Sequence, residues 1–434
     1  MKTFFKKVLS YILIIESRLV LLKYKPKIIA VTGSVGKTGT KDAVFAVISG
    51  VAYVRKSEKS YNSEIGLPLT ILGCPNGWSN PYIWCKNILK GLWLFLAPHK
   101  YPKWLVLEVG VGKPDDMRRT ASWLKTDAVI MTAIGETPVH IEFFDSRKHL
   151  IDEKSELIKT LKKDGILILN ADDEAVLEMK NKTKNRVITY GFSKDANLVG
   201  SGENILYNEA GAPRGIVFRV DEGGNSLPVT IERVFGRNHI YASLASLALS
   251  SGLKFNMINA VNALKDYEIS PGRMNLLDGM NGSLIIDDTY NSSPSACETA
   301  LNTLNTIKSS GRKIAILGDM LELGKHTKEA HNNIGKIASQ NLNGNRDVLV
   351  VVGPRAGDIK AGAIEMGMKI ESILEFINST DAGEYMKDFI KAGDLVLVKG
   401  SQGMRMERTV LAILADKTNS EKLLVRQDKE WQSR

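Results

Sequence analysis

A short glycine-rich segment carries the clearest chemical signal in the sequence. Val31-Thr-Gly-Ser-Val-Gly-Lys-Thr38 follows an apolar, β-branched run and opens a helical pattern. Glycines let backbone N–H groups approach phosphate oxygens, a lysine reaches the outer phosphates, and a threonine hydroxyl can ligate Mg²⁺. We therefore predict a nucleotide phosphate loop rather than a glycine-rich turn before a surface helix. The loop is a short variant, because Val31 stands where the general pattern has its first glycine.

Two side chains that end or follow later strands could be metal ligands. Glu108 ends the apolar run 104–108. A carboxylate at the carboxyl end of a buried strand is costly unless it is paired or bound to metal, so Glu108 is either a Mg²⁺ ligand or an edge-strand glutamate that faces solvent. His140 follows the next strand and is either a metal ligand or an ordinary loop histidine.

Lys154 lies inside an apolar helical stripe. Over residues 147–163 the apolar side chains recur at helical spacing, at Leu150, Ile151, Leu157, Ile158 and Leu161. Lys154 either extends its ammonium group to water or is buried beside the phosphate site, where it could be chemically converted.

The second half of the chain carries another polar constellation. Pro271-Gly-Arg273 precedes Asp287-Asp-Thr-Tyr-Asn291, which follows an apolar run. An arginine suits phosphate, an aspartate suits ribose hydroxyls, and a tyrosine can support a base, so these residues suit a nucleotide bound between two domains. The alternative is a salt bridge that links the domains, next to a turn.

Alternating elements must position these residues. Apolar strand patterns at 27–31, 104–109, 128–134 and 166–169 alternate with helical stretches, and a second series has strands at 284–286, 313–317, 348–352 and 395–398. This alternation predicts an α/β fold, with a central P-loop ATPase domain built on a mostly parallel sheet and a C-terminal Rossmann-like α/β domain.

The domain boundaries follow from the same patterns. We expect a basic, apolar N-terminal helix at 1–26, a central ATP-binding domain at 27–270 and a C-terminal domain at 271–416. Within the central domain we expect an aromatic and basic insertion at 71–104 and a small antiparallel β insertion at 195–235. The segment 417–434 is polar and charged, which predicts a frayed tail.

Composition excludes several classes. The 434 residues, 44% of them hydrophobic, predict about three folded domains rather than a disordered chain. Three scattered cysteines argue against a disulfide framework or a cysteine zinc site and favour a reducing compartment. The net charge of +10 lies in two segments: residues 1–27 have seven cations and one acid, and residues 71–104 have four lysines and no acid. We therefore expect no nucleic-acid partner.

The two basic segments are also apolar. Residues 4–22 carry too many charges for a spanning helix, so an interfacial or packed helix is predicted. Segment 71–104 contains four tryptophans and reads either as a membrane-interface element or as a core helix with a solvated lysine edge. We expect the two segments to form a membrane-facing patch.

Ten ordered motifs together resemble the ATP-dependent Mur ligases over residues 27–416. Six lie in the first half: Thr32-Gly-Ser-Val-Gly-Lys-Thr38, Asn62-Ser-Glu-Ile-Gly-Leu-Pro68, Leu107-Glu-Val-Gly110, His140-Ile-Glu-Phe-Phe144, Glu153-Lys-Ser-Glu156 and Asn170-Ala-Asp-Asp173. Four resemble the branch that adds D-alanyl-D-alanine: Pro271-Gly-Arg273, Asp287-Asp-Thr-Tyr-Asn-Ser-Ser-Pro294, Leu317-Gly-Asp-Met-Leu-Glu-Leu-Gly324 and Val398-Lys-Gly-Ser401.

The resemblance implies roles for individual residues. It implies catalytic roles for Lys37, Lys154, His140 and Asn62. It implies that ATP contacts Gly33, Ser34, Val35, Gly36, Lys37, Thr38, Asn238, Arg273, Asp288, Tyr290 and Asn291. It implies Mg²⁺ ligands at Thr38, Glu108, His140 and Lys154, the last as a carbamate. The residues that close over the amine substrate would be Lys399, Gly400 and Ser401.

The sequence departs from the family pattern in three places. Only 26 residues precede the first strand, so we expect the family's usual N-terminal UDP-binding domain to be absent. Gly236-Arg-Asn-His-Ile-Tyr-Ala242 exchanges the family's histidine and asparagine and has Ala242 where a second asparagine usually lies near adenine, so we expect Asn238 to substitute. Gly39 stands in place of a serine or threonine, and a glycine in the first helical turn costs up to about 1 kcal/mol.

The function implied by the resemblance is an ATP- and Mg²⁺-dependent peptide ligase of peptidoglycan precursor synthesis. ATP would phosphorylate the carboxylate of a muramyl tripeptide, and the amine of D-alanyl-D-alanine would attack the acyl phosphate. One alternative is a Mur-type ligase with a different, lipid-linked acceptor, and another is a degenerate ATP-binding scaffold at the membrane, which binds nucleotide without turnover. We expect a cytoplasmic monomer, peripheral at the inner face of the membrane through 1–26 and 71–104.

Overall fold

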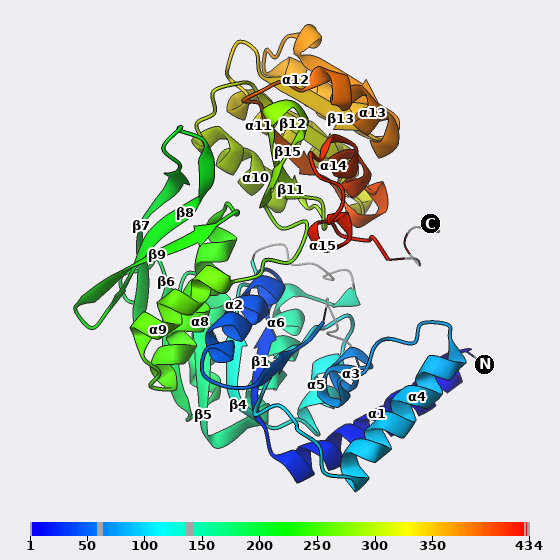
Figure 1. Ribbon diagram of the computed structural model, residues 1–434, viewed down its shortest axis with the longest axis vertical. Helices are drawn as coiled ribbons and strands as arrows, with labels where there is room; N and C mark the ends of the chain where they lie inside the picture. Colours follow the sequence, from blue (N-terminus) through cyan, green and yellow to red (C-terminus); the bar gives the residue numbers. More distant parts are fainter. Residues whose placement is uncertain (1, 59–63, 136–142, 429–430, 432–434) are drawn as a thin grey trace. The chain divides into compact units, whose positions relative to one another are not determined.

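The computed structural model describes residues 2–58, 64–135, 143–428 and 431, with side chains from residue 7 onward. Asn62 and His140 therefore lie outside the described residues. The chain divides into two compact units (Figure 1). Unit 1 comprises residues 1–202, 218–229 and 237–268, and unit 2 comprises residues 203–217, 230–236 and 269–434.

In the described part of the chain, the first sheet has nine strands in the order β2-β3-β1-β4-β5-β6-β7-β8-β9. All pairings from β2 to β7 are parallel, which confirms the predicted mixed α/β fold with a mostly parallel sheet. The strands are β1 (Lys27–Thr32), β2 (Val54–Lys56), β3 (Trp104–Glu108), β4 (Thr126–Met131), β5 (Leu161–Asn170), β6 (Arg186–Gly191), β7 (Leu198–Tyr207), β8 (Pro213–Glu222) and β9 (Asn225–Glu232).

Helices flank this sheet. They are α1 (Lys2–Tyr24), α2 (Lys37–Ser49), α3 (Gly66–Leu72), α4 (Pro81–Leu96), α5 (Asp116–Ala121), α6 (Arg147–Ser155), α7 (Glu174–Leu177), α8 (Arg237–Gly252) and α9 (Met257–Ala263). Local sequence explains where several begin: the Asn80 side chain accepts N–H groups of the first turn of α4, which has Pro81 at its first position, and Ser146 caps α6.

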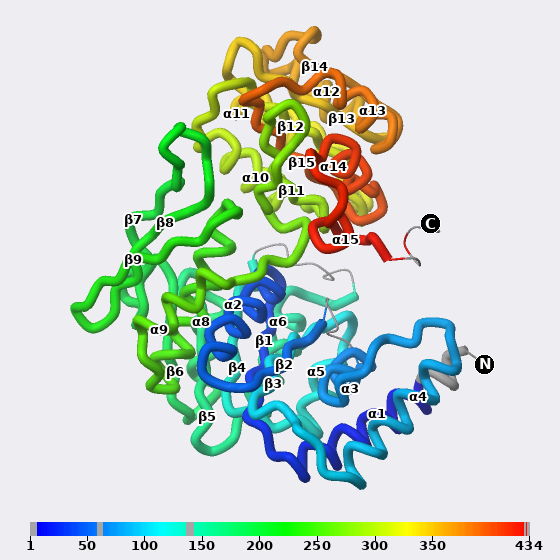
Figure 2. Tube along the Cα trace, in the orientation of Figure 1, coloured from blue at the N-terminus to red at the C-terminus, as the bar shows by residue number. Residues whose placement is uncertain are grey.

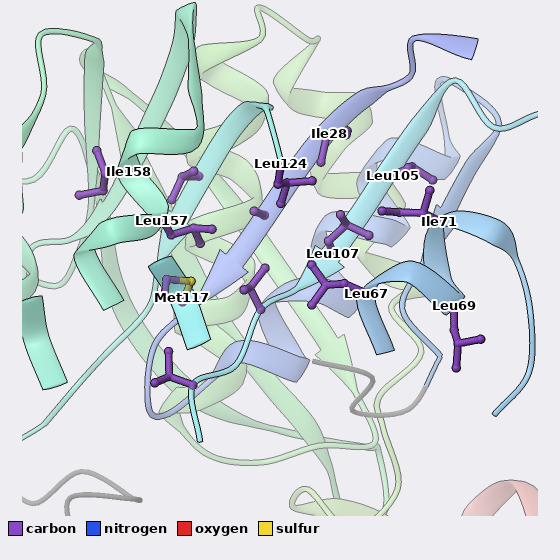
Figure 3. Packing of buried hydrophobic residues seen from close by; sticks show 14 of the residues in the cluster. Ile28, Leu67, Leu69, Ile71, Leu105, Leu107, Met117, Leu124, Leu157 and Ile158 are labelled. Carbon is purple, nitrogen blue, oxygen red and sulfur yellow. The ribbon is translucent and has the colours of Figure 1, made fainter. Parts of the chain in front are cut away.

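A buried hydrophobic cluster joins the sheet to α1, α3 and α5 (Figure 3). Strands β1 and β3 alternate apolar side chains into it, and the helices supply their own apolar stripes. The residues labelled in Figure 3 are Ile28, Leu67, Leu69, Ile71, Leu105, Leu107, Met117, Leu124, Leu157 and Ile158. The cluster holds β1 and β3 in register, so their carboxyl ends lie side by side.

Unit 2 contains a second sheet, in the order β10-β11-β15-β12-β13-β14. Its pairings are parallel except that of β10 with β11. The strands are β10 (Asn275–Asp278), β11 (Leu284–Asp288), β12 (Lys313–Gly318), β13 (Val348–Val352), β14 (Ile373–Phe376) and β15 (Leu395–Lys399). The helices are α10 (Pro294–Thr306), α11 (Thr327–Asn341), α12 (Ala356–Glu365), α13 (Ser379–Phe389), α14 (Glu407–Ile413) and α15 (Ser420–Leu423).

Two local predictions need correction. The helix predicted over 147–163 ends earlier, because α6 is followed by a 3₁₀ turn at Glu156–Thr160 and Leu161 begins β5. An apolar residue fits a helix or a strand, so apolar periodicity alone does not locate the end of the helix. Segment 195–235 contains β7, β8 and β9, which continue the first sheet, and its description as a small β insertion stays a prediction. The polar segment 417–434 is not frayed in its described part, because Arg426 is buried and bonded to Glu407 and to two backbone carbonyls.

Candidate functional site

The predicted phosphate loop connects β1 to α2 and is held by the end of β4. The backbone N–H groups of Ser34 and Val35 donate to the carbonyl oxygen of Ala133, at 2.7 and 3.0 Å. Gly33 has φ of 147°, and a Cβ there would lie 2.0 Å from Thr132 Oγ1, so only glycine fits. Thr132, a residue that the sequence reasoning missed, also lies 2.6 Å from the carbonyl oxygen of Val35. Its only signal is a polar residue directly after an apolar strand.

Two lysine side chains converge on this loop. The Nζ atom of Lys37 donates to the carbonyl oxygens of Gly33 and Ser34, at 2.9 and 3.0 Å. The Nζ atom of Lys154, from α6, donates to the same Gly33 oxygen at 3.0 Å. Lys154 is only 2% exposed, so its side chain does not extend to water. The structure thus selects the buried alternative for Lys154 and places two cations where an anionic ligand would be attracted.

Burial changes the acidity of Lys154. Desolvation, followed by the positive charge of Lys37, lowers its pKa from 10.5 to about 7. At neutral pH a large fraction of this amine is therefore uncharged and nucleophilic, which an exposed lysine would not be.

The lowered pKa predicts a pH-dependent gain in stability for Lys154→Met. Between pH 7 and 10.5 the amine of Lys154 is protonated in the unfolded state but uncharged in the folded state, so the free energy of unfolding rises with pH across this range. Below pH 7 the amine is charged in both states, and its burial then destabilises the folded state most. We expect Lys154→Met to raise the free energy of unfolding by roughly 3 kcal/mol near pH 6 and by less than about 1 kcal/mol near pH 10.

Urea denaturation in carbonate-free buffer measures this difference. The exposed Lys159→Met serves as a control and should change the free energy of unfolding by less than about 0.5 kcal/mol at both pH values. An equal effect of Lys154→Met at the two pH values would contradict the assignment.

Further polar groups surround the loop in unit 1. Glu108 is 1% exposed, and it ends β3 beside Val31 of β1, so the edge-strand alternative that faces solvent is wrong. Ser57 Oγ accepts its backbone N–H at 3.2 Å. Thr38 is buried in the first turn of α2. Among the described residues no cluster of three or more His, Cys, Asp or Glu side chains forms a ready metal cage.

The polar groups of the loop suit a bound phosphate group. The hydroxyl oxygens of Thr32 and Ser34 are buried and have no hydrogen-bond partner within the described part of the chain. Burying a hydroxyl without a partner costs free energy, and a phosphate oxygen would accept a hydrogen bond from either. Together with Lys37 and the N-terminus of α2, these groups suit an anionic ligand.

The departures from the family pattern near this loop have a packing explanation. His239 is buried, with Nδ1 3.3 Å from the hydroxyl of Tyr267, and that hydroxyl donates to the carbonyl oxygen of Gly39 at 3.2 Å. A Cβ at Gly39 would approach Tyr267 Oη to 3.1 Å, so a larger residue would be crowded. Ala242 is buried against the same position, whereas Asn238 is exposed in the first turn of α8.

Acidic residues of two quoted motifs have positioning roles that their sequence did not reveal. Asp173 Oδ2 accepts the backbone N–H groups of Ile134 and Gly135, at 2.8 and 3.0 Å, and so holds the segment after β4. Glu153 is buried beside Lys154, and its Oε1 accepts the Met117 N–H of α5 at 2.7 Å. These carboxylates stabilise the loop and the helix that carry Thr132 and Lys154.

A second polar cluster lies at the carboxyl edge of the sheet in unit 2. Lys399 Nζ, at the end of β15, lies 2.6 Å from Asp288 Oδ2 at the end of β11, and it donates to the carbonyl oxygen of Asn291 at 3.0 Å. The Arg273 guanidinium stacks on the Tyr290 ring at 3.9 Å. The structure thus brings together within unit 2 the predicted Arg273, Asp288, Tyr290, Asn291 and Lys399.

Gly400 and Ser401 complete this edge. Ser401 Oγ accepts the backbone N–H of Leu321 at 2.9 Å. A Cβ at Gly400 would lie 2.6 Å from Met406 Cγ, which requires glycine there. Both residues are buried, so their observed contacts organise the loop, and a contact with the amine substrate stays a prediction.

Comparisons with known proteins identify the class. Residues 87–250 match the Mur ligase middle domain, and residues 272–402 match the family described as Mur ligase, glutamate ligase domain. The fold and the phosphate loop agree with this match, and the chain belongs to the Mur ligase family of ATP-dependent ligases.

Individual relatives belong to one branch. UDP-N-acetylmuramoyl-tripeptide--D-alanyl-D-alanine ligase from Bacillus subtilis is 28% identical over 384 residues, which cover 88% of this chain and 75% of that protein. The enzyme of the same name from Mycobacterium leprae is 27% identical over 90% of this chain and 74% of its own length.

Solved structures show the same fold. MurF from Acinetobacter baumannii has a TM-score of 0.74 at 21% identity, covering 91% of this chain and 78% of that chain. MurF from Thermotoga maritima in complex with ADP has a TM-score of 0.73 at 24% identity, covering 95% of this chain and 84% of that chain.

Proposed function

We propose that this chain is an ATP-dependent ligase that joins D-alanyl-D-alanine to the carboxylate of a muramyl tripeptide in peptidoglycan precursor synthesis. The relatives that carry this activity in their names support the substrates. The observation that carries the chemistry is the convergence of Lys37 and Lys154 on one carbonyl of a loop that fits phosphate.

The reaction would proceed in two steps. A carboxylate oxygen of the tripeptide attacks the γ-phosphorus of ATP, and ADP leaves. The amine nitrogen of the dipeptide then attacks the carbonyl carbon of the acyl phosphate, phosphate leaves, and the nitrogen loses a proton to give the amide. Carboxylate and triphosphate are both anions, so Lys37 and the N-terminus of α2 would offset their repulsion.

A divalent cation would be held beside the phosphate loop, by residues of α2 and α6 and by the carboxyl end of β3. Thr38, Glu108 and Lys154, the last as a carbamate, are candidate ligands. His140, which is outside the described residues, is the candidate ligand of a second Mg²⁺. Bound Mg²⁺ would neutralise phosphate charge. The uncharged amine of Lys154 can add to carbon dioxide, forming an N–C bond and releasing a proton, which would convert a buried cation into an anionic ligand.

The remaining candidate residues would bind the substrates. In unit 1 these are the loop residues Gly33 to Gly36, Asn62 and the exposed Asn238 of α8. In unit 2, Arg273, Asp288, Tyr290 and Asn291 would contact the nucleotide, and Lys399 to Ser401 would lie near the amine. We propose a monomer, which size-exclusion chromatography with light scattering can check.

A purified-protein assay tests this function. The chain is incubated with ATP, Mg²⁺, a UDP-linked muramyl tripeptide and D-alanyl-D-alanine, and phosphate release and the product mass are measured. We expect both to require the dipeptide, and L-alanyl-L-alanine serves as the matched control. No release with either a UDP-linked or a lipid-linked acceptor would refute the proposal.

A lipid-linked muramyl peptide is the second candidate acceptor. The observation that favours it is the exposed apolar surface of α1 and α4, within the segments 1–26 and 71–104, which suits peripheral contact with a membrane. Comparing turnover of the UDP-linked and lipid-linked tripeptides under the same conditions distinguishes the two acceptors.

A further inference from the structure

Helices α1 and α4 form a tightly joined pair at the outside of unit 1. They lie side by side (Figures 1 and 2) with their C-terminal ends together. Lys23 Nζ donates to the carbonyl oxygens of Leu94 and Phe95, at 3.0 and 2.8 Å, which places a cation at the C-terminal end of α4. The Tyr24 ring stacks on the Tyr101 ring, with centroids 4.6 Å apart. The pair is therefore a fixed part of unit 1.

The inner faces of both helices are buried. On α4 the buried residues are Trp84, Asn87, Gly91 and Leu94, which recur on one face of the helix. Leu9, Leu13 and Val20 of α1 belong to the hydrophobic cluster of unit 1. Gly91 faces Glu16 so closely that a Cβ there would approach Glu16 Oε2. Burial raises the pKa of Glu16 to about 7.

The outer face of α4 is apolar, where a helix facing water would be polar. Tyr82, Leu89, Trp93 and Leu96 lie opposite the buried stripe and are 75%, 66%, 61% and 67% exposed. The exposed stripe of α1 likewise contains Val8, Tyr11, Ile15 and Leu22. Contiguous exposed apolar side chains of this size are typical of an interaction surface.

The charges around this apolar surface indicate the partner. Glu16 is the sole acid in the sequences of α1 and α4, and it is buried. The exposed cations on or beside these helices include Lys7, Arg18, Lys23, Lys25, Lys86 and Lys90, with Lys100 and Lys103 after α4. Exposed tryptophan and tyrosine next to lysine suit the headgroup region of a bilayer, and an excess of cations suits anionic lipid.

We propose that the outer faces of α1 and α4 dock on a bilayer that contains anionic lipid. No helix among the described residues is long and apolar enough to cross a membrane. The pair therefore lies in the plane of the interface, with the aromatic and leucine side chains in the headgroup and upper acyl region and the lysines against lipid phosphates. This inference is independent of the proposed ligase reaction.

Vesicle co-sedimentation tests the proposal. The whole chain should bind vesicles of equal parts phosphatidylglycerol and phosphatidylcholine, bind pure phosphatidylcholine at least about tenfold less tightly, and lose affinity as salt is added. Leu89→Glu/Trp93→Glu should lower affinity for the mixed vesicles at least about tenfold. Ile377→Glu is the matched control, because Ile377 is an apolar residue of unit 2 that is 83% exposed. This variant should bind the mixed vesicles as the wild type does.

A second pair of variants separates charge from apolar contact. Lys86→Glu should reduce binding to the mixed vesicles several-fold, whereas Lys184→Glu, an exposed lysine elsewhere in unit 1, should not. Point variants are required because deleting residues 1–22 would remove Leu9, Leu13 and Val20 from the core. Unchanged melting temperatures show that the variants fold.

Three outcomes would overturn the proposal. In the first, the wild-type chain binds neither kind of vesicle. In the second, Leu89→Glu/Trp93→Glu binds the mixed vesicles as tightly as the wild type does. In the third, the wild-type chain binds no vesicles but forms a dimer, and the double variant dissociates that dimer. The last outcome would assign the surface to a second copy of the chain. Leu89→Glu/Trp93→Glu and Lys86→Glu should turn over ATP with a soluble acceptor at the wild-type rate. Failure of membrane docking and failure of the ligase proposal therefore give different results.

Discussion

Lys37→Met is expected to reduce ATP turnover by about 10³-fold or more while leaving the fold intact. The Lys37 ammonium group donates to two carbonyl oxygens of the phosphate loop, and it lies where charge develops on a transferring phosphoryl group. A loss of 10³ corresponds to about 4 kcal/mol of transition-state stabilisation. Phosphate release, measured with saturating acceptor and dipeptide, checks the prediction.

The controls for Lys37→Met isolate the position of the charge. Lys184→Met removes an exposed lysine of unit 1 and should retain full turnover. Lys37→Arg keeps the charge but replaces a compact ammonium group by a planar fork, so partial activity is expected. Because Lys37 is only half-buried, its loss should change the melting temperature little. Full turnover by Lys37→Met would show that the loop is not the phosphate site, and would revive the degenerate-scaffold alternative.

Lys399→Met is expected to cost about 3 kcal/mol of folding free energy or more. Lys399 is 2% exposed and lies 2.6 Å from Asp288 Oδ2. Removing one partner of a buried ion pair leaves the other charge uncompensated in a poorly solvated site, which costs roughly 3 to 5 kcal/mol. Asp287, next to it, already has a pKa raised to about 6 by burial, so this edge of the sheet tolerates negative charge poorly. Urea denaturation measures the loss.

A double variant shows whether the uncompensated charge is the cause. Adding Asp288→Asn to Lys399→Met should recover more than half of the lost stability, because no charge is then left alone. Lys387→Met breaks the exposed ion pair with Glu384 on α13 and should cost less than about 1 kcal/mol. A loss as small as that of Lys387→Met would show that the Lys399–Asp288 pair contributes no more than a surface pair.

The two variants also separate chemistry from architecture. Lys37 donates to two backbone oxygens of the phosphate loop, where a phosphoryl group would lie, so its removal acts mainly on the reaction. Lys399 joins two strand ends, β11 and β15, and also bonds the carbonyl oxygen of Asn291, so its removal acts first on the scaffold that positions Tyr290 and Asn291. Turnover of Lys399→Met should therefore be compared at a temperature where the variant remains folded.

Local patterns were sufficient wherever a few adjacent residues carry the signal. Glycine spacing after a β-branched run located the phosphate loop, and the alternation of strand and helix patterns predicted the α/β class, because both depend on backbone geometry over short distances. Some elements were missed or misplaced: β2, β6, β10 and β14 were not predicted, and α6 is shorter than expected. The same reasoning could not foresee that Arg426 would be buried, since a charged tail becomes ordered only through distant partners.

The amino-acid sequence alone shows which chemical groups are available: a lysine and threonine closing a glycine loop, a glutamate ending a strand, and an arginine, aspartate and tyrosine in the second domain. Which of these groups meet depends on how distant elements pack in the folded chain. Lys154 could have faced water or protein until α6 was placed with its Nζ atom 3.0 Å from the Gly33 carbonyl, 121 residues away in the chain. Burial, and with it the pKa, depends on every element that packs around a side chain, and periodicity in one helix does not contain that information. The same reason explains why the apolar outer faces of α1 and α4 could be recognised only after their inner faces had been found buried.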